Sequence, residues 1–213
     1  MSSMKQDPVL DFEQMLKNVL ARKPFTFIRF SDGEMEILRN NKLFIGDGKV
    51  QWSKGEVLFP YPDFDRKDFV PDRDQAFRYM LTESAVHRSN SYLKGVPAQH
   101  NRADRDRDWM IELNGGSLQG LTFADLFINS NFRRFRSEFL PALVARDDVA
   151  VLGNFRMEPR KLNENWKHVK IQDNFIPDFE LVLESAMEAL EKLPHGYIIL
   201  ASASSLSNVA GFK

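Results

Sequence analysis

The chain has 213 residues, of which 43% are hydrophobic and 28% charged, with a formal net charge of −1 and no cysteine. This composition is typical of a globular domain and speaks against wholesale disorder. The near-zero charge argues against general nucleic-acid binding, and the lack of cysteine excludes disulfides, thiolate nucleophiles and cysteine metal sites. Because no stretch resembles a secretory signal or a membrane span, we expect a soluble, cytoplasmic protein.

The first third of the chain has the pattern of helix, strand and helix. Apolar residues at helical spacing predict a helix over 11–21. The alternation of Phe25 and Phe27 predicts a strand that ends near Arg29, and a second helical pattern follows it. Residues 41–71 lack a clear period and contain three prolines and three glycines. Because long irregular segments are often functional, we predict an active-site flap over 41–71.

The rest of the chain alternates between helical and strand patterns. A continuous apolar run at 197–201 is typical of a strand buried on both faces. The alternation predicts an α/β, Rossmann-like single domain over 1–213, with a mostly parallel sheet and helices on both faces. The expected helices cover 72–87, 105–113, 122–145 with a break at 129–131, and 178–193; the expected strands cover 92–93, 149–152, 169–171 and 197–201.

Small or polar residues follow several of the expected strands. The carboxyl ends of parallel strands lie at one edge of a sheet, so these residues are candidates for one ligand site. Glycine lets a ligand approach the backbone, and amides at a helix N-terminus attract phosphate. The same residue types also form ordinary turns, so both interpretations stay open. The candidates are Asp32, Gly33, Glu34, Gly95, Gly153, Asn154, Ser204 and Ser205.

The turn from Ser31 to Glu34 is the most informative of these segments. It carries two carboxylates and a glycine, with Arg29 two residues before it. Such a turn suits a divalent metal that is shared with substrate phosphates. Alternatively, Ser31 and Glu34 form a capping box, which satisfies helix amides without any further function. The spacing alone does not decide between a metal site and a cap.

Two other polar patterns are weaker candidates for a site. Asp104, Asp106 and Asp108 alternate with arginines, which oppose a cation, so a solvated helix start is the favoured interpretation. The four histidines have no metal-ligand spacing, and His100 is the one that we consider for a site.

The segment Arg29-Phe30-Ser31-Asp32-Gly33-Glu34 resembles the Arg-Phe-Gly-Asp-Gly-Glu signature of GT-D-type bacterial glycosyltransferases. Segments 92–97, 149–154, 174–175 and 198–208 are similar to that family in order and position. The sequence departs from the signature at Ser31, where glycine is usual. It also ends at Lys213, before a further strand that family members tend to have, so either the chain is truncated or that strand is absent.

The resemblance implies a metal-dependent glycosyltransferase. Asp32 and Glu34 would be the Asp-x-Glu motif that holds Mn²⁺ or Mg²⁺ on the diphosphate of a nucleotide sugar, typically a UDP-sugar. Arg29, Gly33, Gly95, Gly153, Asn154, Ser204 and Ser205 would contribute to substrate binding. The acceptor would be a glycan of a surface polysaccharide or glycoprotein. The alternatives are a metal-dependent phosphotransferase or nucleotide hydrolase, and a non-catalytic nucleotide-sugar-binding module.

Overall fold

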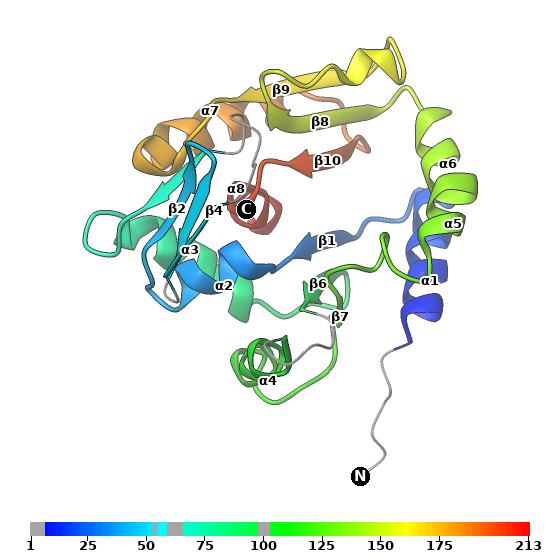
Figure 1. Cartoon of the computed structure of the whole chain (residues 1–213). Helices are drawn as coiled ribbons and strands as arrows, with labels where there is room; N and C mark the ends of the chain where they lie inside the picture. Colours follow the sequence, from blue (N-terminus) through cyan, green and yellow to red (C-terminus); the bar gives the residue numbers. More distant parts are fainter. Residues whose placement is uncertain (1–6, 53–54, 59–65, 98–102) are drawn as a thin grey trace. The chain divides into compact units, whose positions relative to one another are not determined.

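The computed structural model describes residues 7–52, 55–58, 66–97 and 103–213 (Figure 1). The chain divides into two compact units, each built from two separate segments. Unit 1 comprises Met1–Ser31 and Ala85–Asp148, and unit 2 comprises Asp32–Ser84 and Val149–Lys213. The first boundary therefore falls inside the predicted Arg29–Glu34 motif.

Unit 1 contains a three-stranded parallel sheet in the order β1-β6-β7. Phe27 of β1 is in register with Leu93 of β6, and the two strands are parallel, as expected for the sheet. Helix α1 contacts β7, and α4 contacts β6. The elements are α1 (Pro8–Leu20), β1 (Thr26–Arg29), β6 (Tyr92–Val96), α4 (Ala103–Leu113), β7 (Leu121–Phe123), α5 (Phe132–Arg134), a π-helical turn (Phe135–Phe139) and α6 (Leu140–Val144).

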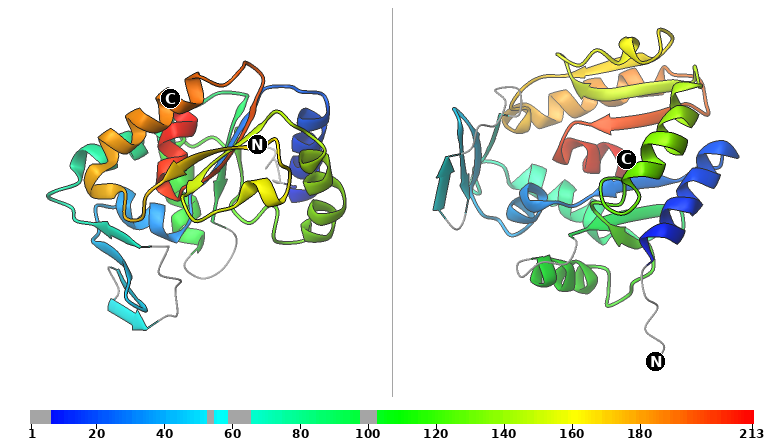
Figure 2. Two further views of the ribbon diagram at one scale, coloured as in Figure 1. Left: turned by 90° about the horizontal axis from the view of Figure 1, so that it is seen from above. Right: turned by 45° about the vertical axis from the view of Figure 1, so that its right-hand side comes forward.

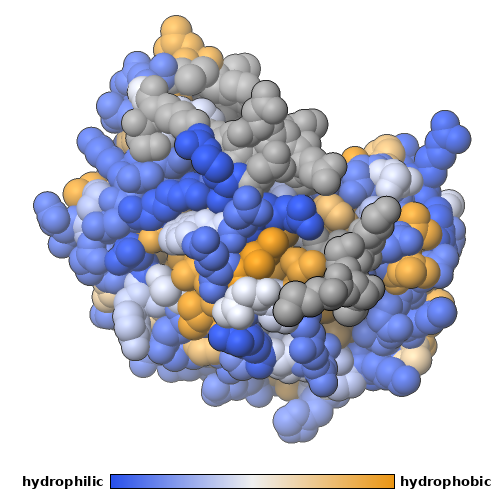
Figure 3. Space-filling model, turned by 90° about the horizontal axis from the view of Figure 1, so that it is seen from below, coloured by the Kyte–Doolittle hydropathy of each residue, from blue (hydrophilic) through white to orange (hydrophobic). Residues whose placement is uncertain are grey.

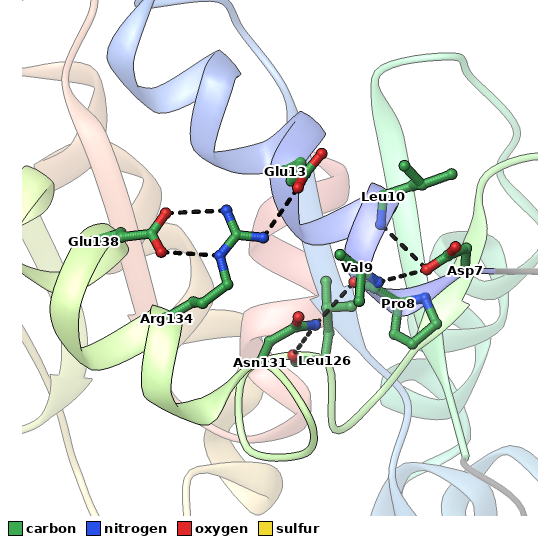
Figure 4. A network of polar contacts seen from close by, with 9 residues as sticks. All are labelled: Asp7, Pro8, Val9, Leu10, Glu13, Leu126, Asn131, Arg134 and Glu138. Carbon is green, nitrogen blue, oxygen red and sulfur yellow. Dashed lines mark hydrogen bonds and ion pairs between the residues drawn. The ribbon is translucent and has the colours of Figure 1, made fainter.

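Polar contacts join α1 to the helical segment of 132–144, which lies beside it (Figures 1, 2 and 4). Arg134 donates two hydrogen bonds to Glu138, of 2.9 and 3.0 Å, and a third of 3.1 Å to Glu13 of α1. Asn131 donates to the carbonyl of Pro8 over 2.8 Å. These bonds hold the start of α1 against the loop that follows β7.

Aromatic packing forms much of the core of unit 1. The half-buried Phe127 lies at the centre of a cluster of rings, with the ring centroids of Phe12, Phe27, Phe135 and Phe139 at 6.1, 5.3, 5.3 and 5.0 Å. These rings account for several of the 18 phenylalanines of the chain. Edge-to-face and tilted pairs of this kind add to the free energy gained by burying the rings.

The predicted helix over 122–145 is only partly correct. Residues 121–123 form strand β7, and the helical structure begins at Phe132. Lys94 of β6 is in register with Leu121, so backbone pairing with β6 determines this strand. A three-residue strand is too short to show a period of two, and its apolar residues therefore resemble a helix pattern.

Unit 2 contains a parallel sheet of three strands, in the order β10-β8-β9. Helix α7 packs against β9, α8 packs against β10, and the two helices contact each other (Figures 1 and 2). The elements are α2 (Asp32–Leu38), β2 (Leu43–Gly46), β3 (Lys49–Trp52), β4 (Gly55–Leu58), β5 (Lys67–Phe69), α3 (Gln75–Val86, which ends in unit 1), β8 (Val149–Asn154), a 3₁₀ turn (Pro159–Lys161), β9 (Lys167–Ile171), a 3₁₀ turn (Ile176–Asp178), α7 (Phe179–Glu191), β10 (Ile198–Ser202) and α8 (Ser205–Phe212).

The α/β class and the parallel pairing of strands are confirmed, whereas the expectation of one sheet is not. The described strands form two parallel sheets and one antiparallel sheet. The strand over 197–201 was expected to be buried on both faces, and this is wrong, because Ile199 is 39% exposed. It lies in β10 at an edge of its sheet, and an apolar run cannot by itself distinguish an edge strand from a central one.

The segment predicted to be irregular, 41–71, contains four strands in the antiparallel order β4-β3-β2-β5. Asp47 and Gly48 both have positive φ, of 53° and 72°, and close the two-residue hairpin between β2 and β3. An Asp-Gly pair is a strong hairpin signal, so the sequence alone could have predicted this hairpin. Residues 53–54 and 59–65 lie outside the described part, and a flap function of 41–71 stays a prediction.

The face drawn in Figure 3 is mostly hydrophilic, with hydrophobic residues in patches between polar ones. Phe132 and Phe155 are both 46% exposed, so not all phenylalanines belong to the core. Of the helices in the described part of the chain, none is long and apolar enough to cross a membrane.

Candidate functional site

The Arg29–Glu34 motif has the strand–turn–helix context expected of it. Strand β1 ends at Arg29, and the N–H of Phe30 extends its pairing by donating to the carbonyl of Gly95 over 2.8 Å. Helix α2 then begins at Asp32. The guanidinium of Arg29 is exposed and donates to the hydroxyl of Ser31 over 3.3 Å. The motif therefore lies at the carboxyl end of a parallel strand, as predicted.

The two carboxylates of the motif differ in environment. Asp32 is exposed, whereas Glu34 is only 8% exposed. Residues two apart on a helix do not share a face, which explains the difference. Asp32 is thus the carboxylate that a ligand in solvent can reach.

The residues around the motif supply few metal ligands of their own. Within the described ranges, no group of three or more His, Asp or Glu side chains is arranged to hold a metal ion. A divalent cation can still bind through one or two carboxylates when substrate phosphates and water complete its coordination. The exposed Asp32 fits that kind of site, whereas the side chain of Glu34 is largely buried.

Gly33 and Gly95 differ in whether their surroundings leave space for a side chain. A Cβ at Gly33 would meet its nearest neighbour, Leu43 Cδ2, at an ordinary 3.6 Å. A Cβ at Gly95 would lie 2.9 Å from the Cα of Ala124 and 3.1 Å from the carbonyl oxygen of Phe123. Packing in unit 1 therefore accounts for Gly95, whereas packing does not account for Gly33.

Gly153 and Asn154 end strand β8, and Asn154 shapes the segment that follows. Its Nδ2 donates to Asp173 Oδ1 over 2.6 Å, and its Oδ1 accepts from the N–H of Arg156 over 3.0 Å. Arg156 also forms an ion pair of 2.6 Å with Asp173. Asn154 therefore has a structural role, besides any contact with substrate.

Ser204 and Ser205 form the entry to α8. Ser204 has φ 51° and ψ −142°, a sparsely populated conformation for a non-glycine residue. Such strain is of the order of 1–3 kcal/mol and is common at functional sites. Ser205 is fully buried, and its hydroxyl has no hydrogen-bond partner in the described structure.

The structure brings the predicted residues together in small groups. Arg29 is in register with Gly95 in unit 1. In unit 2, Gly153 is in register with Ser202, the last residue of β10 before the turn to Ser205. The convergence of all the strand ends on one edge stays a prediction, since the strands belong to separate sheets.

The two weaker candidates have different outcomes. Helix α4 begins at Ala103, which confirms the helix start at the alternating aspartates. Asp106 is only 3% exposed, so the expectation of a fully solvated start is wrong for this residue. Helix α4 contacts β6. His100 lies outside the described residues.

Two features of the structure were not predicted from the sequence. One is an open pocket of about 710 Å³ beside β9, lined by Phe155, Arg156, Met157, Glu158, Pro159, Arg160, Lys161, His168 and Lys170. The signal that could have indicated it is the density of cationic residues after Asn154. The other feature is Lys94, which is only 1% exposed although it stands in the middle of a strand. No local pattern distinguishes it from an ordinary surface lysine.

No family model matches the chain, and no curated protein and no solved structure matches it. The function is therefore inferred from the residues and their geometry.

Proposed function

We propose that the protein is a metal-dependent glycosyltransferase with a Rossmann-like arrangement of its parallel strands, acting in the cytoplasm. It transfers a sugar from a nucleotide donor, a UDP-sugar in our proposal, to a glycan of a surface polysaccharide or glycoprotein. The observation that supports this most is the exposed Asp32 at the start of α2, directly after the carboxyl end of strand β1. This is the position at which open α/β sheets bind phosphate-bearing ligands.

The side chains around Asp32 have chemistry that suits a diphosphate. A bound Mn²⁺ or Mg²⁺ would neutralise the charge on the departing nucleoside diphosphate. Asp32 would hold the cation, with Glu34 as the second carboxylate of the motif. The exposed guanidinium of Arg29 can donate charge-assisted hydrogen bonds to the same phosphates. Gly33, at which an added Cβ would meet Leu43 Cδ2 at 3.6 Å, has no side chain that would keep a phosphate away from its backbone.

The alternatives make different products, so an assay of products separates them. A panel of nucleotide sugars is incubated with and without Mn²⁺, and free nucleoside diphosphate and monophosphate are measured. A glycosyltransferase releases the diphosphate from one donor, in a Mn²⁺-dependent way. A hydrolase or phosphotransferase cleaves or transfers a phosphate instead, and a binding module releases nothing although it binds the donor.

A pair of variants connects this assay to the motif. Asp32→Asn should abolish Mn²⁺-dependent release. Asp72→Asn changes another exposed aspartate, outside the motif, and should have no effect. Equal activity of the Asp32 variant and the wild type would refute the proposal.

A further inference from the structure

The connection between β8 and β9, residues 155–166, is a folded loop with its own anchors. Pro159 is buried, and Trp166 is among the largest fully buried side chains of the chain. Asn163 accepts a hydrogen bond of 3.1 Å from the N–H of Trp166 and itself donates to the carbonyl of Pro159 over 3.4 Å. The loop is therefore held at both its middle and its end, and the pocket of about 710 Å³ lies between it and β9.

The pocket is lined by more cations than carboxylates. Its lining includes Arg156, Arg160, Lys161 and Lys170, with Glu158 as the single carboxylate. Arg156 is neutralised by Asp173 at 2.6 Å, and Lys161 by Glu158. Among the ion pairs of the described residues, none involves Arg160 or Lys170. Within the described part of the chain, no ion pair therefore compensates the charges of these two side chains.

The two cations come from two different elements that line the pocket. Arg160 belongs to the loop, in the 3₁₀ turn, whereas Lys170 belongs to β9. His168 and Lys170 stand two residues apart on that strand, so their side chains share one face of the sheet. The ring of His168 is held by a contact of 3.3 Å between its Nε2 and the carbonyl oxygen of Gly153.

The pocket also offers an apolar surface. Phe155 is 46% exposed, with the guanidinium of Arg156 4.5 Å from its ring centroid. Met157, which is 37% exposed, lies beside it in the lining. A volume of about 710 Å³ is within the range of small-molecule sites. The pocket thus combines room for a small organic molecule with two cations that no ion pair compensates among the described residues.

We propose that this pocket binds a small molecule that carries a phosphate group, with Arg160 and Lys170 as its phosphate-binding residues. Arginine and lysine are the usual side-chain donors to phosphate, and Phe155 would pack against the organic part of the ligand. Binding needs no metal, since cations of the protein supply the positive charge. The inference goes beyond the proposed function and does not depend on it.

Calorimetric titration of pyrophosphate and of uridine monophosphate, in buffer with EDTA, tests this site. We expect saturable binding to the wild type and an affinity at least about tenfold lower in the double variant Arg160→Gln/Lys170→Gln, because two charge-assisted contacts are lost. Lys192→Gln removes an exposed cation outside the pocket and should leave the affinity unchanged. Melting temperatures of all variants should agree, since Arg160 and Lys170 are exposed.

The same titration distinguishes this pocket from the motif at Asp32. Asp32→Asn should bind both probes in EDTA as the wild type does, even if the glycosyltransferase proposal fails. The inference is overturned if the wild type shows no saturable binding, or if the double variant and Lys192→Gln bind equally well. It is also overturned if Asp32→Asn loses binding while the double variant keeps it.

Discussion

Lys94 Nζ donates a 2.8 Å hydrogen bond to Asn114 Oδ1 in the interior of unit 1, where the two residues are 1% and 0% exposed. The same ammonium group donates to the carbonyls of Ala85 and His87 over 2.7 and 2.8 Å. Asn114 in turn donates to two backbone carbonyls of the segment 117–119, over 2.6 and 3.1 Å. One buried pair thereby connects the end of α3, the end of α4 and the approach to β7.

Replacing Lys94 should destabilise the protein strongly. Lys94→Met keeps the apolar stem and leaves the acceptors on Ala85, His87 and Asn114 unsatisfied in the core. Since each buried group without a partner costs roughly 1–3 kcal/mol, we expect a loss of about 3 kcal/mol or more in the free energy of unfolding. Urea denaturation measures it, with Lys192→Met as a surface control. A loss below about 1 kcal/mol would contradict the role of the pair.

The stability should also depend on pH through Lys94. Burial, together with the nearby charge of Arg88, lowers the pKa of Lys94 from 10.5 to about 8. Between these two values the folded state has lost the proton while the unfolded state still holds it. The contribution of Lys94 to stability therefore rises with pH from about pH 8 to 10.5, with a slope of at most about 1.4 kcal/mol per pH unit.

The measurement is the free energy of unfolding of the wild type and of Lys94→Met across this pH range. When the free energy of unfolding of the variant is subtracted from that of the wild type, the contributions of the other titrating groups cancel. We expect the wild type to gain stability relative to the variant as the pH rises. Parallel pH profiles would show that the pKa of Lys94 is not lowered in the folded state.

The carboxylates of the motif separate a metal site from a helix cap. Asp32→Asn and Glu34→Gln should both abolish Mn²⁺-dependent binding of UDP if both carboxylates take part. If Glu34 only caps α2, Glu34→Gln should keep this binding, because glutamine serves equally well in a capping box. Ser31→Ala should cost only about 1 kcal/mol of stability. Calorimetry with UDP and Mn²⁺ measures the affinity, and the melting temperature reports on the fold.

The different burial of the two carboxylates makes this comparison sharper. Asp32 is exposed, so its variant should keep the melting temperature of the wild type. Glu34 is 8% exposed, and a lower melting temperature of its variant alone would indicate a structural role. Unchanged UDP affinity in both variants would remove the support for a glycosyltransferase.

Gly33 and Gly95 form a matched pair for a second test of the motif. Gly33→Ala has space for its Cβ and places alanine in a helix, so stability should be unchanged or higher by about 0.5–1 kcal/mol. Gly95→Ala brings its Cβ within 2.9 Å of the backbone and should cost about 1–3 kcal/mol. Urea denaturation of both variants checks this order. If Gly33→Ala were the less stable variant, the close contact between residue 95 and the backbone of Ala124 would not be the reason for glycine at that position.

The pair also reports on ligand binding. If a phosphate approaches the backbone at Gly33, Gly33→Ala should weaken Mn²⁺-dependent UDP binding although the fold is intact. Normal affinity in this variant would mean that neither packing nor the ligand requires glycine there.

The sequence by itself determined the elements that a short local pattern specifies, such as helical spacing over a few turns or the alternation of a single strand. The helix expected over 11–21 is α1, with Asp7 accepting from the N–H groups of Val9 and Leu10 as its N-cap. The strand ending at Arg29 and the helix after it are β1 and α2. The hairpin at Asp47-Gly48 belongs to the same class, because its turn needs two residues that tolerate positive φ. These features depend on interactions between residues that are close in the sequence, so the sequence alone is enough to predict them.

Only the tertiary structure decided the features that depend on distant partners. Residues 121–123 are a strand because β6 pairs with them, and the exposure of Ile199 in the edge strand β10 depends on what covers that strand. Lys94 is buried because carbonyls at the end of α3 and the side chain of Asn114 surround its ammonium group. The pocket of Arg160 and Lys170 arises because the loop after β8 folds back beside β9. Hydrogen bonds and burial act between residues that are close in space, and a period along the chain does not report that proximity.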